Sequence, residues 1–225
     1  AARAKVISRS AANLLMILDS ILDYSKIESG KMRIDIQSCA IRELLESSCE
    51  LYRHSAKAKE YDIHLNVDSG VPKVLDIDAG KISQIINNLL SNAVKFTSEG
   101  SVSVNVSYAH HALKVVVSDT GVGIAPEKLD LIFEQFEQAD STTTRHFGGT
   151  GLGLPISKGL IELLDGQLFV ESELGKGTRF TFHIPAAVGK EEEHEPDVDI
   201  VDVKPSLPTN LKVLLAEDND INAEI

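Results

Sequence analysis

The sequence predicts a fold that mixes helices and strands, α/β in the broad sense and α+β in the strict one. It is expected to be a two-layer sandwich with one layer of helices on a mixed sheet. Helical and strand-like patterns follow one another in mixed order, and the last two predicted strands are close enough in sequence to form a hairpin. The 225 residues are 43% hydrophobic, which suffices for a core of ordinary size. No run of the sequence approaches the roughly 18 apolar residues of a membrane-spanning helix.

Residues 5–28 predict one amphipathic helix that ends before Gly30, a residue suited to a C-terminal cap. The positions of its stripe recur three or four residues apart: Leu14, Ile17, Leu18, Ile21, Leu22 and Ser25. No neighbouring segment would cover this stripe. We therefore expect a missing partner helix or a second copy of the chain to bury it, with an ordinary core helix as the alternative.

The segments that follow alternate between strand and helix patterns. Alternation of Met32, Ile34 and Ile36 predicts a first strand. Helices are expected at residues 41–59, 79–96 and 151–164, with a short one after Pro126, and strands at 63–67, 101–108, 113–119, 167–172 and 178–184. A short turn near His110 joins two of these strands, and residues 137–150 form a polar, Gly-rich loop. This mixed order supports the α+β assignment.

The last part of the chain differs in composition. Residues 188–210 carry acidic side chains and three prolines, as expected of a linker, and a short buried-strand pattern at 211–216 precedes Glu217 and Asp218. The whole chain has 22 Lys and Arg against 34 Asp and Glu, a formal charge of −12. This balance argues against binding of a nucleic-acid backbone, although a single nucleotide could have its charge met locally.

The predicted helix at 79–96 carries a narrow polar stripe. At about 100° per residue, Gln84, Asn88, Asn92 and Lys95 fall at roughly 0°, 40°, 80° and 20°, opposite an apolar arc. Such a stripe is usually a solvated helix face. Two asparagines are unusual there, because Asn is a mediocre helix former. Their amide oxygens, however, suit a hard cation such as Mg²⁺.

Two glycine-containing segments are further candidates for a binding site. Asp119 ends an apolar strand and begins DTGVGI at residues 119–124, where a flat ligand could approach the backbone closely; a strand-ending turn is the alternative. FGGTGLGL at residues 147–154 opens a helix and offers backbone N–H groups to an anion. This second segment matches neither the Walker loop nor the dinucleotide-binding fingerprint.

In this order, the three elements resemble the ATP-binding domain of sensor histidine kinases, which belongs to the GHKL/Bergerat superfamily. The resemblance extends over about residues 32–185 and includes NLLSNAVKFT at 88–97, IFEQF at 132–136 and GKGT at 175–178. It implies a Bergerat-type fold, preceded by one helix of a dimerisation hairpin, with ATP and Mg²⁺ as cofactors.

The resemblance also implies roles for individual residues. Asn88 and Asn92 would hold Mg²⁺ and the phosphates, and Lys95 would neutralise phosphate charge. Asp119 would accept a hydrogen bond from the adenine amino group, and Arg145, in a lid, would contact the γ-phosphate. The implied ATP-binding residues are Asn88, Asn92, Lys95, Asp119, Gly121, Gly123, Ile124, Phe133, Arg145, Gly149, Thr150, Gly151, Leu152, Gly153, Leu154 and Thr178.

Both flanks extend the resemblance. LDSILDYSKIESGK at 18–31 resembles the end of the second helix of a dimerisation and phosphotransfer domain, and VLLAEDN at 213–219 resembles the first strand and the acidic pocket (Glu217 and Asp218) of a receiver domain. The expected domains are a hairpin remnant (1–31), the ATP-binding domain (32–187), a linker (188–210) and the start of a receiver (211–225).

These domains imply a set of partners. A homodimer would form through the hairpin, and the receiver in the same chain would act with a downstream response regulator or phosphotransfer protein. Neither nucleic acid nor direct membrane contact is implied. The residues would form a cytoplasmic portion of a longer protein, with any membrane anchor elsewhere in it.

The phosphoacceptor histidine of this family is missing from the sequence. No histidine lies in a helix before an acidic residue and Arg-x-Pro, and His194 falls in the linker. The implied function is that of the ATP-binding part of a hybrid sensor histidine kinase. Such a protein-histidine kinase would transfer the γ-phosphate of ATP to a histidine outside these residues, and the phosphoryl group would then pass to a receiver aspartate. A catalytically silent, nucleotide-responsive scaffold is one alternative. A chaperone or mismatch-repair type of ATPase is another, although a Glu would be expected there in place of Asn88.

Overall fold

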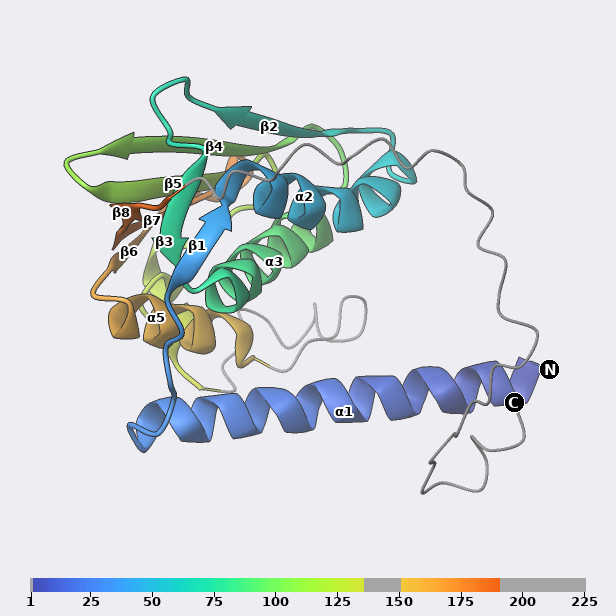
Figure 1. The fold of residues 1–225 in the computed structure, drawn as a ribbon. Helices are drawn as coiled ribbons and strands as arrows, with labels where there is room; N and C mark the ends of the chain where they lie inside the picture. The colour runs from blue at the N-terminus through green and yellow to red at the C-terminus, as the bar shows by residue number, and fades with distance from the viewer. Residues whose placement is uncertain (1, 136–150, 191–225) are drawn as a thin grey trace, which may run out of the picture. The chain divides into compact units, whose positions relative to one another are not determined.

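The structure, a computed structural model, describes residues 2–135 and 151–190. The chain divides into two compact units, residues 1–191 and 192–225, and the second lies outside the described residues. The described helices are α1 (Ala2–Glu28), α2 (Ile41–Lys57), α3 (Ala79–Phe96) and α5 (Gly153–Leu163), with the 3-10 turns η1 (Pro126–Lys128) and η2 (Leu131–Phe133) (Figure 1). The described strands are β1 (Gln37–Ala40), β2 (Ile63–Val67), β3 (Val74–Ile77), β4 (Val102–Ala109), β5 (Ala112–Asp119), β6 (Gln167–Glu173), β7 (Gly177–Pro185) and β8 (Ala187–Val188).

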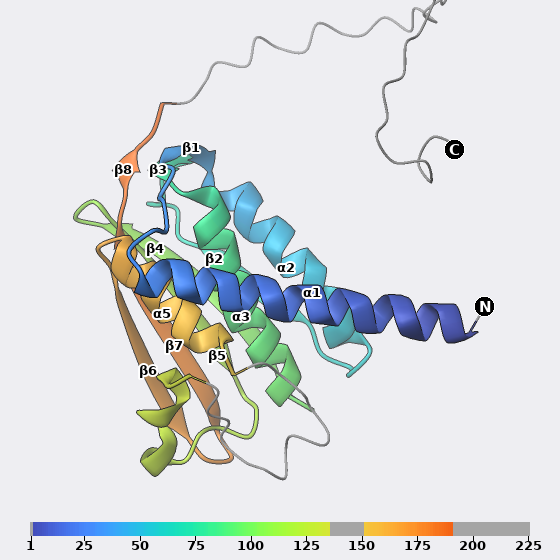
Figure 2. The same ribbon diagram turned by 90° about the horizontal axis from the view of Figure 1, so that it is seen from below.

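These strands form two sheets. The larger has the order β2-β4-β5-β7-β6, with β2 and β4 parallel and the other neighbours antiparallel. The smaller is antiparallel with the order β1-β3-β8. Helices α2, α3 and α5 lie on one side of the larger sheet (Figures 1 and 2). This arrangement confirms the predicted α+β sandwich.

The core lies between the larger sheet and its helices. Alternate residues of β4, β5 and β7 face inward, and the apolar arc of α3 packs on them. The buried residues from these elements include Ile82, Ile85, Ile86, Leu89, Val102, Val104, Val115, Val117, Phe180 and Phe182. Because the opposite side of α3 is not needed for the core, it is free to carry polar side chains.

The carboxylate of Asp78 fixes the start of α3 and also holds the segment before β1, where a strand was predicted. One carboxylate oxygen accepts from the backbone N–H of Lys81 at 2.9 Å, as an N-cap does, and the other accepts from the N–H of Asp35 at 2.9 Å. The strand predicted at Met32–Ile36 is wrong: these residues form no strand, because this segment is held by the Asp78 side chain rather than by a neighbouring strand.

The first strand is instead β1, which begins at Gln37. It pairs with β3, and β3 pairs in turn with β8. Both β3 and β8 were missed from the sequence. Four and two residues respectively are too few to produce a recognisable alternation of apolar and polar positions.

Helix α1 has two differently placed parts. Near its C-terminal end, Tyr24 and Ile27 pack against the core residues, and α1 passes alongside α5 (Figures 1 and 2). Further toward its N-terminus the predicted stripe is exposed, with Leu14 at 60% and Leu22 at 54% of full exposure. The stripe is therefore uncovered in the described chain, as the sequence predicted, while the end of the helix does find a partner.

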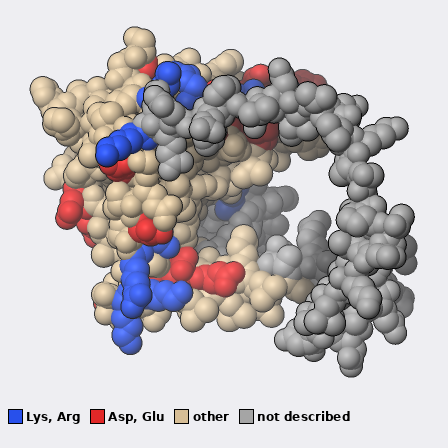
Figure 3. All heavy atoms as spheres, in the orientation of Figure 1, with Lys and Arg blue, Asp and Glu red and all other residues tan. Residues whose placement is uncertain are grey.

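On the face seen in Figure 3, a group of Lys and Arg side chains gathers at the lower left beside Asp and Glu side chains, and the other charged side chains of the described residues lie scattered.

Candidate functional site

Asn88 links α3 to the start of α5. Its amide nitrogen donates to the hydroxyl of Ser157 at 3.0 Å and makes a short contact with the backbone carbonyl of Gly153. A β-carbon at position 153 would overlap with the Asn88 side chain, so only glycine permits this approach. The polar stripe of α3 and the glycine segment, far apart in sequence, are thus brought together.

Asn92 and Lys95 continue this stripe toward the end of α3, and both are half-buried. The ammonium group of Lys95 lies 4.7 Å from the ring centroid of Phe96. Burial lowers the pKa of Lys95 from its ordinary value. A partly desolvated cation would interact strongly with an anionic ligand placed beside it.

Asp119 ends β5, and backbone N–H groups orient its carboxylate. The N–H of Gly121 donates to Oδ1 at 2.8 Å, and the N–H of Thr178 also donates to the carboxylate. Thr178 is the residue directly opposite Asp119 in the β5–β7 pairing. Burial raises the pKa of Asp119, and these two hydrogen bonds oppose the shift.

The glycines after Asp119 are required by the protein's own backbone. A β-carbon on Gly121 would overlap with the carbonyl of Phe96 at the end of α3. One on Gly123, which has φ of 70°, would overlap with the carbonyl of Glu173. Sequence reasoning assigned both glycines to the approach of a base. The structure adds a second reason, because DTGVGI is wedged between α3 and β6.

Thr178 and Ile124 belong to a small polar network around Ser172. The Ser172 hydroxyl accepts from the N–H of Ile124 at 2.8 Å, lies 2.9 Å from the Thr178 hydroxyl and is 2.8 Å from the carbonyl of Gly177. Ser172 was not predicted, and a single serine in a strand gave no signal. It ties the loop after Asp119 to β6 and β7.

The predicted residues at the start of α5 have different surroundings. Gly151 has φ of 69°, and the side chain of Leu152 is only 1% exposed. Leu154 packs against the same core. Leu152 and Leu154 could therefore contact a ligand chiefly through their backbones. Arg145, Gly149, Thr150, the lid, Glu217 and Asp218 lie outside the described residues.

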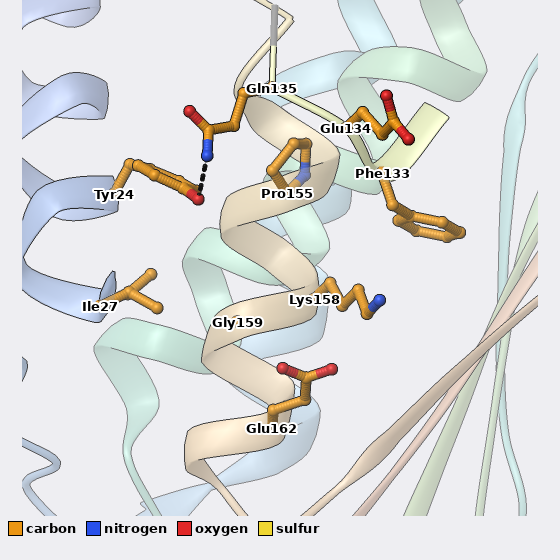
Figure 4. A pocket seen from close by; sticks show the side chains of 9 residues that line it. All are labelled: Tyr24, Ile27, Phe133, Glu134, Gln135, Pro155, Lys158, Gly159 and Glu162. Carbon is orange, nitrogen blue, oxygen red and sulfur yellow. Dashed lines mark hydrogen bonds between the residues drawn. The ribbon is translucent and has the colours of Figure 1, made fainter. Parts of the chain in front are cut away.

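Phe133 lies at a different place, a pocket of about 500 Å³ between α1, η2 and α5 (Figure 4). In it, the ammonium group of Lys158 lies 5.6 Å from the ring centroid of Phe133. Tyr24 and Ile27 of α1 face α5 there, and the Gln135 amide makes a short contact with the Tyr24 hydroxyl. Sequence reasoning missed this pocket, because its residues on α1 lie more than a hundred positions before those on η2 and α5.

Comparison with known proteins places these features in a family context. Residues 77–188 match the family described as histidine kinase-, DNA gyrase B-, and HSP90-like ATPase. The chain is 40% identical over 225 residues to the autoinducer 2 sensor kinase/phosphatase LuxQ of Vibrio cholerae, covering 98% of this chain and 26% of LuxQ. It is 38% identical over 194 residues to the sensor protein GacS of Pseudomonas syringae, covering 84% of this chain and 21% of GacS. The chain thus spans about a quarter of the length of these relatives.

Solved structures show the same fold. Full-length ShkA in complex with AMPPNP gives a TM-score of 0.74 at 32% identity, over 83% of this chain and 39% of that chain. The catalytic domain of the histidine kinase ThkA gives a TM-score of 0.58 at 24% identity, over 67% of this chain and 95% of that chain.

Proposed function

We propose that this chain donates the γ-phosphate of ATP to a histidine, since it belongs, through residues 77–188, to the family of histidine kinase-, DNA gyrase B- and HSP90-like ATPases. Its ATP-binding domain is of the sensor histidine kinase type. The observation that carries this proposal is the convergence of three separated motifs. Asn88 reaches the glycine segment at Gly153, while the loop after Asp119 packs on the carbonyl of Phe96 at the end of the same helix.

Asp119 is the residue that we assign to adenine. Its carboxylate is held at the end of β5 by two backbone N–H groups, which leaves lone pairs for a further donor. The exocyclic amino group of adenine is such a donor, whereas guanine presents a carbonyl oxygen at the corresponding position. Asp119 would therefore select adenine nucleotides.

Asn88 and Asn92 are the residues that we assign to Mg²⁺. The amide nitrogen of Asn88 donates toward α5, so its carbonyl oxygen is the atom available to a cation. The donor chemistry therefore fits. When bound, Mg²⁺ would offset the charge of the phosphates. Lys95, on the same stripe, would bind a phosphate oxygen directly, and Gly151 and Gly153 would let backbone N–H groups face the phosphates.

Transfer would form a bond between the γ-phosphorus and an imidazole nitrogen as ADP leaves, and the imidazole proton would pass to an acidic residue. Both the histidine and that acid would lie outside these residues. The phosphoryl group would then move to an aspartate of the receiver that we propose begins at residue 211. Such a relay, with a downstream regulator or phosphotransfer protein, would make the parent protein a hybrid kinase.

The exposed stripe of α1 supports a dimer of the parent protein. Leucines 48–60% exposed at positions 14, 18 and 22 would be covered by the first helix of the hairpin and by a second copy. We infer that the larger protein dimerises there. None of the described helices is long and apolar enough to cross a membrane, and any anchor would belong to other parts of that protein.

The test has two stages. Calorimetric titration of the chain with Mg²⁺ and a non-hydrolysable ATP analogue should show binding, with a GTP analogue as control. Radiolabelled ATP should then label a supplied helical hairpin that bears an acceptor histidine. Equal binding of both analogues would contradict the assignment of Asp119. Tight, adenine-selective binding with persistent failure of transfer would favour a catalytically silent scaffold.

A further inference from the structure

The ammonium group of Lys59 lies at the C-terminal end of α3, although Lys59 falls in no motif discussed above. It lies in the turn between α2 and β2. Its Nζ is 2.6 Å from the carbonyl oxygen of Val94, 2.8 Å from that of Thr97 and 3.5 Å from that of Lys95. The side chain is half-buried. The three N–H groups of one ammonium group thus face three carbonyl oxygens of one turn.

This arrangement is a cationic cap. The last carbonyl groups of a helix have no partners within the helix and carry partial negative charge. Lysine donates to them through three N–H groups at once. The hydroxyl of Tyr61, two residues further along, adds contacts of 3.3 Å with the carbonyl of Val94 and 3.5 Å with that of Thr97. The turn at residues 94–97 is therefore held from outside α3.

The capped turn carries two groups of the candidate nucleotide site. One is Lys95, assigned above to phosphate. The other is the carbonyl of Phe96, which accepts from the N–H of Val122 at 3.3 Å and packs so closely on Gly121 that a β-carbon there would overlap with it. A displacement of this turn would therefore move a phosphate cation and the loop after Asp119 together.

The charge of Asp119 also reaches the cap. Burial, and to a lesser extent the Asp119 charge, raise the pKa of the Tyr61 hydroxyl. The carboxylate of Asp119 is therefore near enough to the Tyr61 hydroxyl to interact with it electrostatically.

We propose that Lys59 is a positioning residue for the nucleotide: its ammonium group fixes residues 94–97, and through them the spacing between Lys95 and the loop at 119–124. The proposal rests on the proposed function, because it assumes that these groups bind ATP. Lys59 itself would not touch the nucleotide. It would set affinity by holding the groups that do.

The test compares variants of the full 225-residue chain. Lys59→Met removes the ammonium group and keeps an aliphatic stem, whereas Lys59→Arg restores a cation with several N–H donors. Lys57→Met, an exposed lysine two residues earlier, is the matched control. Dissociation constants for the Mg²⁺ complex of a non-hydrolysable ATP analogue are measured well below each unfolding temperature, so that a loss of stability alone does not change them. Amide chemical shifts of Gly121 and Val122 report on the loop.

Lys59→Met should raise the dissociation constant about tenfold, as loss of a supporting partner commonly does, and should shift the amide resonances of Gly121 and Val122. Lys59→Arg should recover most of the affinity, and Lys57→Met should stay within about twofold of the unmodified chain. If Lys59→Met does not fold, Lys59→Gln replaces it.

Two other outcomes separate the claims. A folded Lys59→Met or Lys59→Gln chain that binds the analogue as tightly as the unmodified chain overturns the role of Lys59 alone. An unmodified chain that binds no nucleotide overturns the proposed function and this inference with it.

Discussion

The side-chain amide of Gln84 donates a 2.8 Å hydrogen bond to the carboxylate of Asp23 and so joins α1 to the helix that carries Asn88. Gln84 lies one turn before Asn88 on the same stripe. A few residues further along α1, Ile27 lies so close to Gly159 of α5 that a β-carbon at position 159 would overlap with it. The end of α1 is therefore attached to both helices that carry candidate nucleotide-binding residues.

Gln84→Ala should loosen α1 from the ATP-binding domain. Losing one partly buried hydrogen bond to a carboxylate should lower the local free energy of opening by about 1–2 kcal/mol. Hydrogen exchange of the backbone amides at residues 20–28 should therefore accelerate. Asp19→Ala, an exposed aspartate one turn before Asp23, should leave exchange there unchanged. Equal acceleration in both variants would show that Gln84 has no specific role.

Asp119→Asn should separate nucleotide selection from stability. The variant should lose its preference for adenine over guanine analogues in calorimetric titrations, because an amide can present its N–H₂ group to the base in place of an acceptor. Its fold should persist. An undiminished preference for adenine would show that the base binds elsewhere.

The same substitution gives a prediction for pH dependence. Burial raises the pKa of Asp119 in the folded state, so the folded chain binds this proton more readily than the unfolded chain. The stability that this difference in the pKa of Asp119 contributes is fully present below the pKa of the unfolded chain, about 4. It is lost as pH rises through the pKa of Asp119 in the folded chain. At neutral pH, Asp119→Asn should therefore unfold at a temperature no lower than the unmodified chain. In thermal scans between about pH 4 and 8, the unfolding temperature of the unmodified chain should rise relative to that of the variant as pH falls. The opposite trend would mean that the two N–H donors outweigh burial.

Local patterns were sufficient to predict the long elements. The stripe of α3, the alternation in β4 and β5 and the glycines after Asp119 each depend on neighbours within a few residues, and each was placed correctly from the sequence. Their convergence was predicted only through the resemblance to sensor histidine kinases. The ligand roles of Asn88, Lys95 and Asp119 remain predictions.

Contacts between distant segments could not be predicted. The Lys59 ammonium group meets carbonyls 35 to 38 positions later, and β1 pairs with a strand of four residues that shows no alternation. Asp78 served as an unrecognised anchor for residues 32–36, whose alternation resembles that of a strand. In each case one member of the contact is a backbone group of a distant segment, and a backbone group leaves no mark in the sequence.

The hairpin between β4 and β5 should be stabilised by a change of two residues. His110 and His111 have φ of 51° and 59°, a conformation that side chains with a β-carbon rarely adopt and that two-residue hairpins usually assign to Asn-Gly. Replacing them by His110→Asn and His111→Gly should raise the free energy of unfolding by about 1 kcal/mol, measured by urea denaturation. The carbonyl of residue 111 would still accept from the N–H of Ala186. Nucleotide affinity should not change, since Asp119 lies at the other end of β5. A lower stability would show that the histidine side chains contribute contacts that outweigh the backbone strain.

Gly153→Ala should separate α5 from α3 and weaken nucleotide binding. The added methyl group would overlap with the side chain of Asn88, so either Asn88 rotates away from Ser157 or the start of α5 shifts. Overpacking of this kind costs about 1–3 kcal/mol, and we expect affinity for the Mg²⁺ complex of an ATP analogue to fall by about tenfold or more, because a misplaced ligand-binding group loses much of its interaction. Gly70→Ala is the matched control, since a β-carbon there would meet no atom within 4 Å. If Gly153→Ala destabilised the chain but bound the analogue normally, the contact between Asn88 and Gly153 would serve packing alone, and the assignment of Asn88 to the phosphates and Mg²⁺ would have to be abandoned.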